Sequence, residues 1–373
     1  MVLCATLCLK DQTFSDRKRS GKPDWSDLPP ELIPLISQKI VDISDFVRFR
    51  VVCKRWRSAV QFSDLAPQLP WIIDGFASFK KGYLRFYSIL SGKTYTINVP
   101  QSTDKSVRGS AYNYLLNCNS QTLECSIFNP LTMEEFSLPQ AKFQFPSCVP
   151  YLGQSSRYVV MSKSPLTEDC TPLFLCQPGD YKWTRINGSL IQSRYRKERG
   201  EFLNSGFTFY DGRCYATDLK TGSTKVIDLV TRTMIYVVPP PEPELPGGFV
   251  YLVASFGDIL RVCHYKKYSE ETLGYYFRIY RLEFGHRDGN AMDPCWVEID
   301  NISNQFLFLH DIHGCAFRAE DFPRFVANGI YFSKANLMKN TFELFRYGLK
   351  EPKLEVLPAP VTLGHVWFVP SLC

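Results

Sequence analysis

The sequence predicts an α+β multidomain protein: a small N-terminal module of three helices followed by an all-β propeller of about six blades. Apolar residues recur at helical spacing over 25–60 and then alternate almost to the end of the chain. The alternating part falls into clusters of short strands at intervals of about 40 to 50 residues. Residues that favour strands are frequent, with 28 Phe and 20 Tyr. We therefore divide the chain into a disordered tail (1–21), a helical module (22–65) and a propeller (70–373).

The first predicted helix begins around the segment Leu28-Pro29-Pro30-Glu31. Proline is favoured at the start of a helix, and the charge of Glu31 in the first turn suits the helix dipole. Pro34 is tolerable if the helix starts at Pro30 or later, because Pro34 then also falls in the first turn. The apolar residues of this helix predict one apolar face: Leu32, Ile33, Leu35, Ile36 and Ile40.

Two shorter helices are predicted after a polar break at 42–45, where Ser44 or Asp45 is the expected N-cap. Apolar residues mark the second helix (Phe46, Val47 and Phe49) and the third (Cys53, Trp56, Ala59 and Val60). Basic residues are expected on the opposite, solvated face: Lys54, Arg55 and Arg57. A module of about 40 residues buries too little surface to be comfortably stable alone, so a partner or a neighbouring domain is expected to cover it.

Residues 25–60 resemble an F-box, the module that joins a substrate receptor to an SCF-type cullin–RING ubiquitin ligase. The resemblance is one of register, and it includes Leu28-Pro29, Arg48-Phe49-Arg50, Val52-Cys53-Lys54 and Trp56. It implies a substrate-recognition subunit without catalytic residues or cofactors, whose partners are an SKP-type adaptor and, through it, cullin and RING subunits. Carried over by position, the adaptor-binding surface comprises Leu28, Pro29, Leu32, Ile33, Ile36, Val51, Val52, Cys53 and Trp56. The alternative is a helical cap with only a structural role on a propeller scaffold or ligand-binding module.

The second region repeats a plan in which one strand ends in a turn and the next strand follows, as at 125–138 and 224–238. This plan resembles the kelch-like blades that follow the F-box in plant proteins. Two late segments, 319–323 and 328–332, also resemble the plant F-box family whose C-terminal half is classed as a domain of unknown function. Five or seven blades, or two large packed sheets, remain alternatives. Residues 62–71 would close the ring if they gave a strand to the last blade.

Composition limits the partners and the compartment. The net charge of +6 is mild and basic runs do not surround the aromatic residues, so nucleic-acid binding is not indicated. The 13 cysteines are odd in number and form no CxxC pair, which favours free buried thiols, as at Cys118, Cys176, Cys214 and Cys263. The N-terminus lacks the features of a signal peptide, and no apolar run approaches the roughly 20 residues of a membrane span. We expect a nuclear or cytosolic protein.

The segment 310–315, His-Asp-Ile-His-Gly-Cys, is the one cluster of metal-ligand residue types. In an extended strand His310 and His313 would point to opposite faces, and no second group completes four ligands, so no metal is expected. Motifs of hydrolases, nucleotide-binding proteins and zinc proteases are absent from the sequence. The enzyme alternative, a sialidase-like site, would need several Arg with a Tyr/Glu pair in one propeller mouth.

Overall fold

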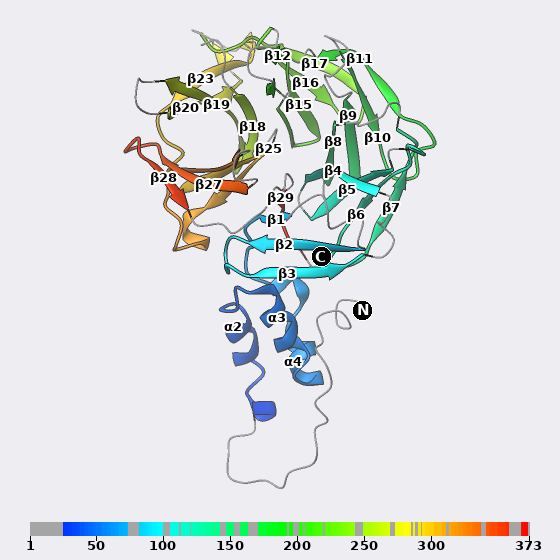
Figure 1. The fold of residues 1–373 in the computed structure, drawn as a ribbon, viewed down its shortest axis with the longest axis vertical. Coiled ribbons are helices and arrows are strands. Elements are labelled where there is room, and N and C mark those ends of the chain that lie inside the picture. The colour runs from blue at the N-terminus through cyan, green and yellow to red at the C-terminus, as the bar shows by residue number, and fades with distance from the viewer. Residues whose placement is uncertain are drawn as a thin grey trace.

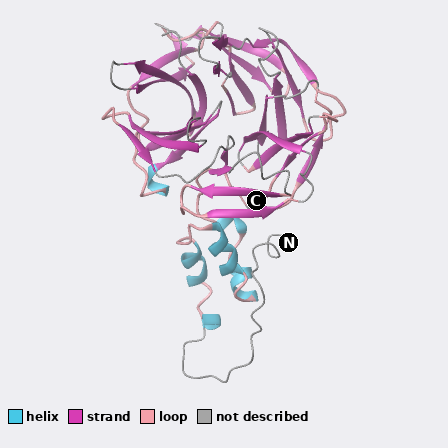
Figure 2. Cartoon of the chain, viewed as in Figure 1, coloured by secondary structure: helices cyan, strands magenta, loops and turns pink. Residues whose placement is uncertain are grey.

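The computed structural model consists of a helical stalk below a ring of strands, which confirms the predicted fold class (Figure 1, Figure 2). The predicted tail, 1–21, lies outside the described residues. The described residues are 25–73, 82–99, 105–111, 113–119, 121–141, 147–152, 157–162, 171–191, 194–196, 201–203, 206–218, 221–242, 249–268, 273–284, 286–287, 290–291, 293–310, 313–336, 341–357 and 367–371.

The stalk contains the three predicted α-helices and two short 3-10 turns. These elements are η1 (Trp25–Asp27), α2 (Leu32–Ser37), α3 (Ile43–Arg50), α4 (Lys54–Ala59) and η2 (Phe62–Asp64). Helix α2 begins at Leu32, so Glu31 is its N-cap residue instead of a first-turn residue, and Pro34 lies in the first turn. At that position the missing N–H of proline has no intrahelical partner to lose. Within the described part of the chain, no helix is long and apolar enough to cross a membrane.

Five groups of four antiparallel strands form regular blades within the described residues. The first blade contains β1 (Trp71–Ile73), β2 (Tyr83–Ser88), β3 (Thr94–Asn98) and β29 (Trp367–Phe368). The second contains β4 (Lys105–Ala111), β5 (Tyr114–Asn119), β6 (Cys125–Phe128) and β7 (Glu135–Leu138). The third contains β8 (Ser147–Leu152), β9 (Arg157–Ser162), β10 (Thr171–Cys176) and β11 (Thr184–Ile191). The fourth contains β14 (Phe207–Tyr210), β15 (Arg213–Thr217), β16 (Thr224–Asp228) and β17 (Thr233–Val238), and the fifth β18 (Phe249–Ser255), β19 (Asp258–Tyr268), β20 (Leu273–Glu283) and β23 (Cys295–Ile299).

A sixth group completes the ring but departs from the regular pattern. It contains β24 (Gln305–His310), β25 (His313–Arg318), η5 (Ala319–Asp321), β26 (Gly329–Asn336), β27 (Thr341–Gly348) and β28 (Leu354–Leu357). Its strand order is β25-β24-β26-β27-β28, and β24 runs parallel to β26. Two small hairpins lie outside the blades: β12 (Arg194–Arg196) with β13 (Glu201–Leu203), and β21 (His286–Arg287) with β22 (Asn290–Ala291). The prediction of about six blades is therefore confirmed as an approximate count.

The ring is closed by the C-terminal strand, not by residues 62–71 as considered from the sequence. Strand β29 pairs antiparallel with β1, so that Trp71 lies opposite Phe368 and Ile72 opposite Trp367. Residues 62–64 form η2, and Trp71 starts the first blade. The closing strand thus joins the two ends of the propeller within one sheet.

The hydrophobic core lies largely between neighbouring blades. One cluster joins Tyr215 and Val226 of the fourth blade to Leu252 and Cys263 of the fifth. Cys176, Cys214 and Cys263 are buried thiols, as predicted. The expectation of a free thiol is wrong for Cys118, which forms a disulfide with Cys125. The two cysteines are register partners on β5 and β6, a proximity that depends on the pairing of the strands.

The two histidines of 310–315 lie on neighbouring antiparallel strands, not on one extended strand. His310 ends β24, His313 begins β25, and the two residues are register partners. The ring of His310 is buried, its Nδ1 lies 2.9 Å from the Ser333 hydroxyl, and it stacks on Trp367 with a centroid distance of 5.3 Å. Among the described residues, no group of three or more His, Cys, Asp or Glu could hold a metal ion.

Candidate functional site

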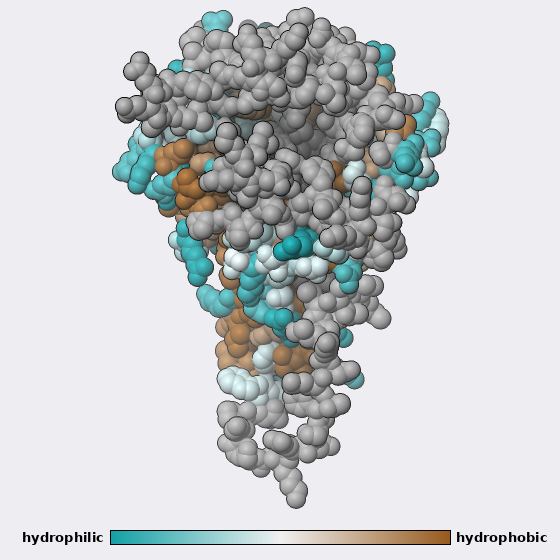
Figure 3. Space-filling view, viewed as in Figure 1, coloured by the Kyte–Doolittle hydropathy of each residue, from teal (hydrophilic) through white to brown (hydrophobic). Residues whose placement is uncertain are grey.

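The exposed side of α2 is apolar. Leu32, Leu35 and Ile36 are 44%, 56% and 38% exposed, while Ile33 on the other side of the helix is fully buried. These three residues recur at the i, i+3, i+4 spacing that places side chains on one side of a helix. The predicted single apolar face is therefore wrong in detail, because Ile33 packs inward and its neighbours face outward. Figure 3 shows the hydrophobic surface on the stalk.

A second exposed apolar segment follows α3, where Val51 and Val52 are 38% and 55% exposed. Large exposed apolar side chains are much denser on the stalk, with eight among residues 25–62, than on the propeller, with ten among its described residues. Such a concentration marks a surface that another molecule covers. We call it the apolar face; its residues are Trp25, Leu32, Leu35, Ile36, Val41, Val51, Val52 and Phe62.

The structure brings most of the sequence-predicted site residues to the surface of the stalk. Exposed are Pro29, Leu32, Ile36, Val51 and Val52, and partly exposed are Leu28 and Cys53. Ile33 and Trp56 are buried, and Trp56 packs on Phe49 with a ring-centroid distance of 4.3 Å. These two residues support the surface from beneath, so any effect of theirs on a partner would be indirect. The predicted solvated basic residues are exposed: Lys54, Arg55 and Arg57.

The predicted adaptor-binding set omits four residues of the apolar face. They are Trp25, Leu35, Val41 and Phe62. Leu35 is predicted on the apolar face of the first helix, and its position three residues after Leu32 could have added it to the set. Phe62 had no such signal, since its position depends on the packing of η2, where the Arg50 guanidinium lies 3.6 Å from the centroid of its ring.

The helices of the stalk share their hydrophobic core with the first two blades. One continuous cluster contains Ile43 and Phe46 of α3, Trp71 and Phe86 of the first blade, and Val107 of the second. Ile43, Phe46 and Trp71 are at most 2% exposed. The predicted need for a neighbouring domain is met by the propeller, which covers the inner side of the stalk and leaves the apolar face outside.

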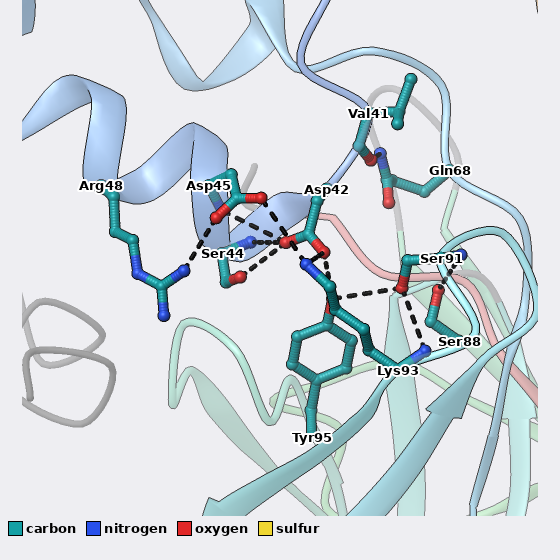
Figure 4. Close-up of polar contacts among 10 residues, drawn as sticks. All are labelled: Val41, Asp42, Ser44, Asp45, Arg48, Gln68, Ser88, Ser91, Lys93 and Tyr95. Atoms are coloured by element: carbon teal, nitrogen blue, oxygen red, sulfur yellow. Dashed lines mark hydrogen bonds and ion pairs between the residues drawn. The ribbon is translucent and has the colours of Figure 1, made fainter.

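A buried carboxylate joins the stalk to the propeller (Figure 4). Asp42, rather than the expected Ser44 or Asp45, is the N-cap of α3, and its Oδ1 accepts hydrogen bonds from the amides of Ser44 at 2.9 Å and Asp45 at 3.2 Å. Its Oδ2 accepts hydrogen bonds from Lys93 Nζ and from the Tyr95 hydroxyl, both at 2.7 Å. Asp42 precedes the helix in an extended conformation, the usual N-cap geometry, which Ser44 and Asp45 inside the helix do not have. One side chain thus starts a helix of the stalk and binds the edge of the first blade.

The electrostatics of this contact keep Asp42 ionised. Burial alone would raise the pKa of the Asp42 carboxyl, but hydrogen bonds from Lys93, Ser44 and Tyr95 outweigh it and hold the pKa well below its usual range. The same contact raises the pKa of Lys93. Burial, with the Asp42 charge, raises the pKa of Tyr95 to about 12. The three groups therefore meet as carboxylate, ammonium and neutral phenol over the ordinary pH range.

Comparison with known proteins agrees with this two-part structure. The F-box domain family matches residues 25–66, and the KIB1-4 beta-propeller family matches residues 86–351. The F-box/kelch-repeat protein At1g57790 of Arabidopsis thaliana is 24% identical over 359 residues, which are 93% of this chain and 94% of that protein. F-box protein SKIP23 of Arabidopsis thaliana is 24% identical over 330 residues, with 77% of this chain and 78% of that protein covered.

The beta-propeller domain of Myceliophteria thermophila Cps50 (Swd1) is among the solved structures that are distantly similar. It aligns with a TM-score of 0.38 and 12% identity, over 81% of this chain and 90% of that chain. A likeness at that score carries no argument about this protein. The match to the propeller family covers well over half of the chain, and the F-box match lies directly before it. This chain belongs to the F-box proteins that carry a KIB1-4 beta-propeller.

Proposed function

We propose that this protein is a substrate-recognition subunit of an SCF-type cullin–RING ubiquitin ligase. F-box proteins are in general non-catalytic adaptor subunits, and the F-box implies binding to an SKP-type adaptor at the level of the family. The observation that carries the proposal is the apolar face of the stalk, which the propeller leaves uncovered. Through the adaptor the chain would join cullin and RING subunits, and its propeller would hold a protein target.

The mechanism is one of proximity. The propeller holds the target while the ligase supplies a conjugating enzyme that carries ubiquitin as a thioester. A lysine amine of the target attacks the thioester carbonyl, an amide bond to ubiquitin forms, and the thiol of the conjugating enzyme leaves. Raising the effective concentration of that lysine accelerates the transfer without a catalytic residue in this chain. The contact around Asp42 supports this mechanism, because it ties the adaptor-binding module directly to the first blade.

Binding of a recombinant SKP-type adaptor to the full chain tests the proposal. Leu35→Asp and Val52→Asp place a charge at positions 56% and 55% exposed, where the fold itself tolerates it. We expect each change to weaken adaptor binding by about tenfold or more, because it buries an unpaired carboxylate in the interface. The matched controls Val230→Asp and Val356→Asp change propeller residues that are 78% and 66% exposed, and they should bind as wild type.

The alternative, a propeller scaffold with a structural helical cap, predicts a different result. In that case the wild-type chain does not bind the adaptor, or the stalk variants bind it as well as the controls do. We also propose a nuclear or cytosolic location, which the buried thiols Cys176, Cys214 and Cys263 support. Imaging of a fluorescent fusion checks the location, and a signal confined to the secretory pathway would contradict it.

A further inference from the structure

The strand that closes the propeller enters the same hydrophobic core as the stalk. Phe368 of β29 is fully buried and belongs to the cluster that contains Ile43, Phe46 and Val60 of the stalk. Its ring centroid lies 5.4 Å from Phe86, a residue of the first blade. The end of the chain and its N-terminal module are thus packed around one blade, although more than 300 residues separate them.

A chain of direct contacts runs from this strand to α3. The ring centroids of Phe368 and Trp71 are 6.3 Å apart, and Trp71 stacks on Tyr95 at 4.5 Å with an interplanar angle of 9°. The Tyr95 hydroxyl donates to Asp42, and Asp42 caps the N-terminus of α3. Every side chain in the series is buried or partly buried, so each one constrains the position of the next.

The closing strand is also held by the neighbours of the first blade. The Ser110 hydroxyl of the second blade donates to the backbone oxygen of Trp367, and Asn129 Nδ2 donates to the backbone oxygen of Ser371 at 3.4 Å. On the other side, His310 of the sixth group stacks on Trp367. The closing strand and the residues after it therefore contact the first, second and sixth units of the ring at once.

We propose that closure of the propeller and adaptor binding at the stalk stabilise each other, so that the apolar face is correctly held only in a chain whose C-terminal strand is in place. The inference rests on the proposed function for the identity of the ligand, the SKP-type adaptor. A three-helix module of this size gains too little from its own core, and it depends on the shared cluster for its stability. Because coupling between two sites is reciprocal, a bound adaptor also stabilises the closing strand.

The first experiment measures α3 in the absence of any partner. Phe368→Leu keeps an apolar side chain on β29 but removes the ring contacts with Trp71 and Phe86. Phe209→Leu on β14 is the matched control, since Phe209 is also buried but lies in a separate hydrophobic cluster. Amide hydrogen exchange over residues 43–50 should become about tenfold faster in Phe368→Leu and change by less than about twofold in Phe209→Leu.

The second experiment measures the reverse direction with the recombinant adaptor. Saturating adaptor should slow the amide exchange of residues 367–368 and leave that of residues 207–210 unchanged. Phe368→Leu should also weaken adaptor binding by about tenfold, whereas Phe209→Leu should bind the adaptor as wild type does. If the wild-type chain fails to bind the adaptor, the proposed function is refuted. The amide exchange of α3 in Phe368→Leu and Phe209→Leu then still tests whether the closing strand stabilises α3. If the adaptor binds wild type and Phe368→Leu equally and α3 exchange is the same in both variants, the coupling does not exist.

Discussion

Replacement of Asp42 separates the two roles of this carboxylate, the capping of α3 and the contact with the propeller. Asp42→Ala removes both, and the loss of an N-cap costs about 1 kcal/mol. It also removes a hydrogen bond from the half-buried Tyr95 hydroxyl to a charged group, which contributes about 1.5–3 kcal/mol. We expect Asp42→Ala to destabilise the stalk by about 3 kcal/mol in total.

Asp42→Asn gives the comparison that assigns the loss. Asparagine caps a helix about as well as aspartate, so this variant keeps the cap and loses only the charge toward Lys93 and Tyr95. It should cost about 2 kcal/mol, roughly two thirds of the loss expected for Asp42→Ala. The control Asp45→Asn removes a partly exposed carboxylate that pairs with Arg48 at 2.7 Å and more distantly with Lys93 at 3.6 Å, and it should cost less than about 1 kcal/mol.

Urea unfolding, monitored by the amide exchange of residues 43–50, measures these losses in the free energy of unfolding. If Asp42→Ala costs no more than Asp45→Asn, the carboxylate does not hold the stalk on the propeller. If Asp42→Asn costs as much as Asp42→Ala, the N-cap contributes nothing and the ion contacts account for the whole effect. Either result would contradict the assignment of two separate roles to the Asp42 carboxylate.

The same carboxylate predicts how stability depends on pH. The pKa of Asp42 is lower in the folded chain than the value of about 3.9 in an unfolded one. Its contribution is therefore complete above the unfolded pKa and is lost as pH falls through the lower folded pKa. The pKa of Tyr95 is raised to about 12, so its contribution is complete below the unfolded value and is lost as pH rises from about 10 through the folded pKa. Wild type should lose stability of the stalk more steeply than Asp42→Asn below pH 4, measured by unfolding at a series of pH values.

Three further predictions concern the propeller. In Gly206→Ala the new Cβ would lie 2.8 Å from the backbone oxygen of Val250 in the next blade. We therefore expect urea unfolding to show a loss of about 2 kcal/mol or more in the free energy of unfolding. An unchanged urea midpoint would show that the two blades can separate there. The Thr224 hydroxyl is buried without a hydrogen-bond partner among the described residues, so Thr224→Val should be neutral or stabilise by about 1 kcal/mol, and a clear loss of stability would contradict this. Burial raises the pKa of the Cys214 thiol, so iodoacetamide should label exposed Cys295 and leave Cys214 unlabelled in the native chain, as mass spectrometry of peptides can check.

The fold class and the start of α2 are features of this chain that local sequence patterns predict correctly. The helical spacing of 25–60 and the alternating strands after residue 70 gave the correct fold class, because hydrophobic periodicity is a property of neighbouring residues. The position of Pro34 in the first turn of α2 followed from the rule that proline starts helices. The N-cap of α3 was placed two or three residues too late, since several residue types in 42–45 can cap a helix.

Sequence by itself thus determined the kinds of elements, their order and the family to which they belong, together with five exposed residues of the predicted adaptor-binding surface. Tertiary structure decided which apolar residues of α2 face outward, because that choice depends on where the propeller covers the stalk. It also decided the pairing of Trp71 with Phe368, of Cys118 with Cys125 and of Asp42 with Lys93. Such contacts join residues whose distance in space is set by strand register and ring closure, and no local pattern of side chains encodes that distance.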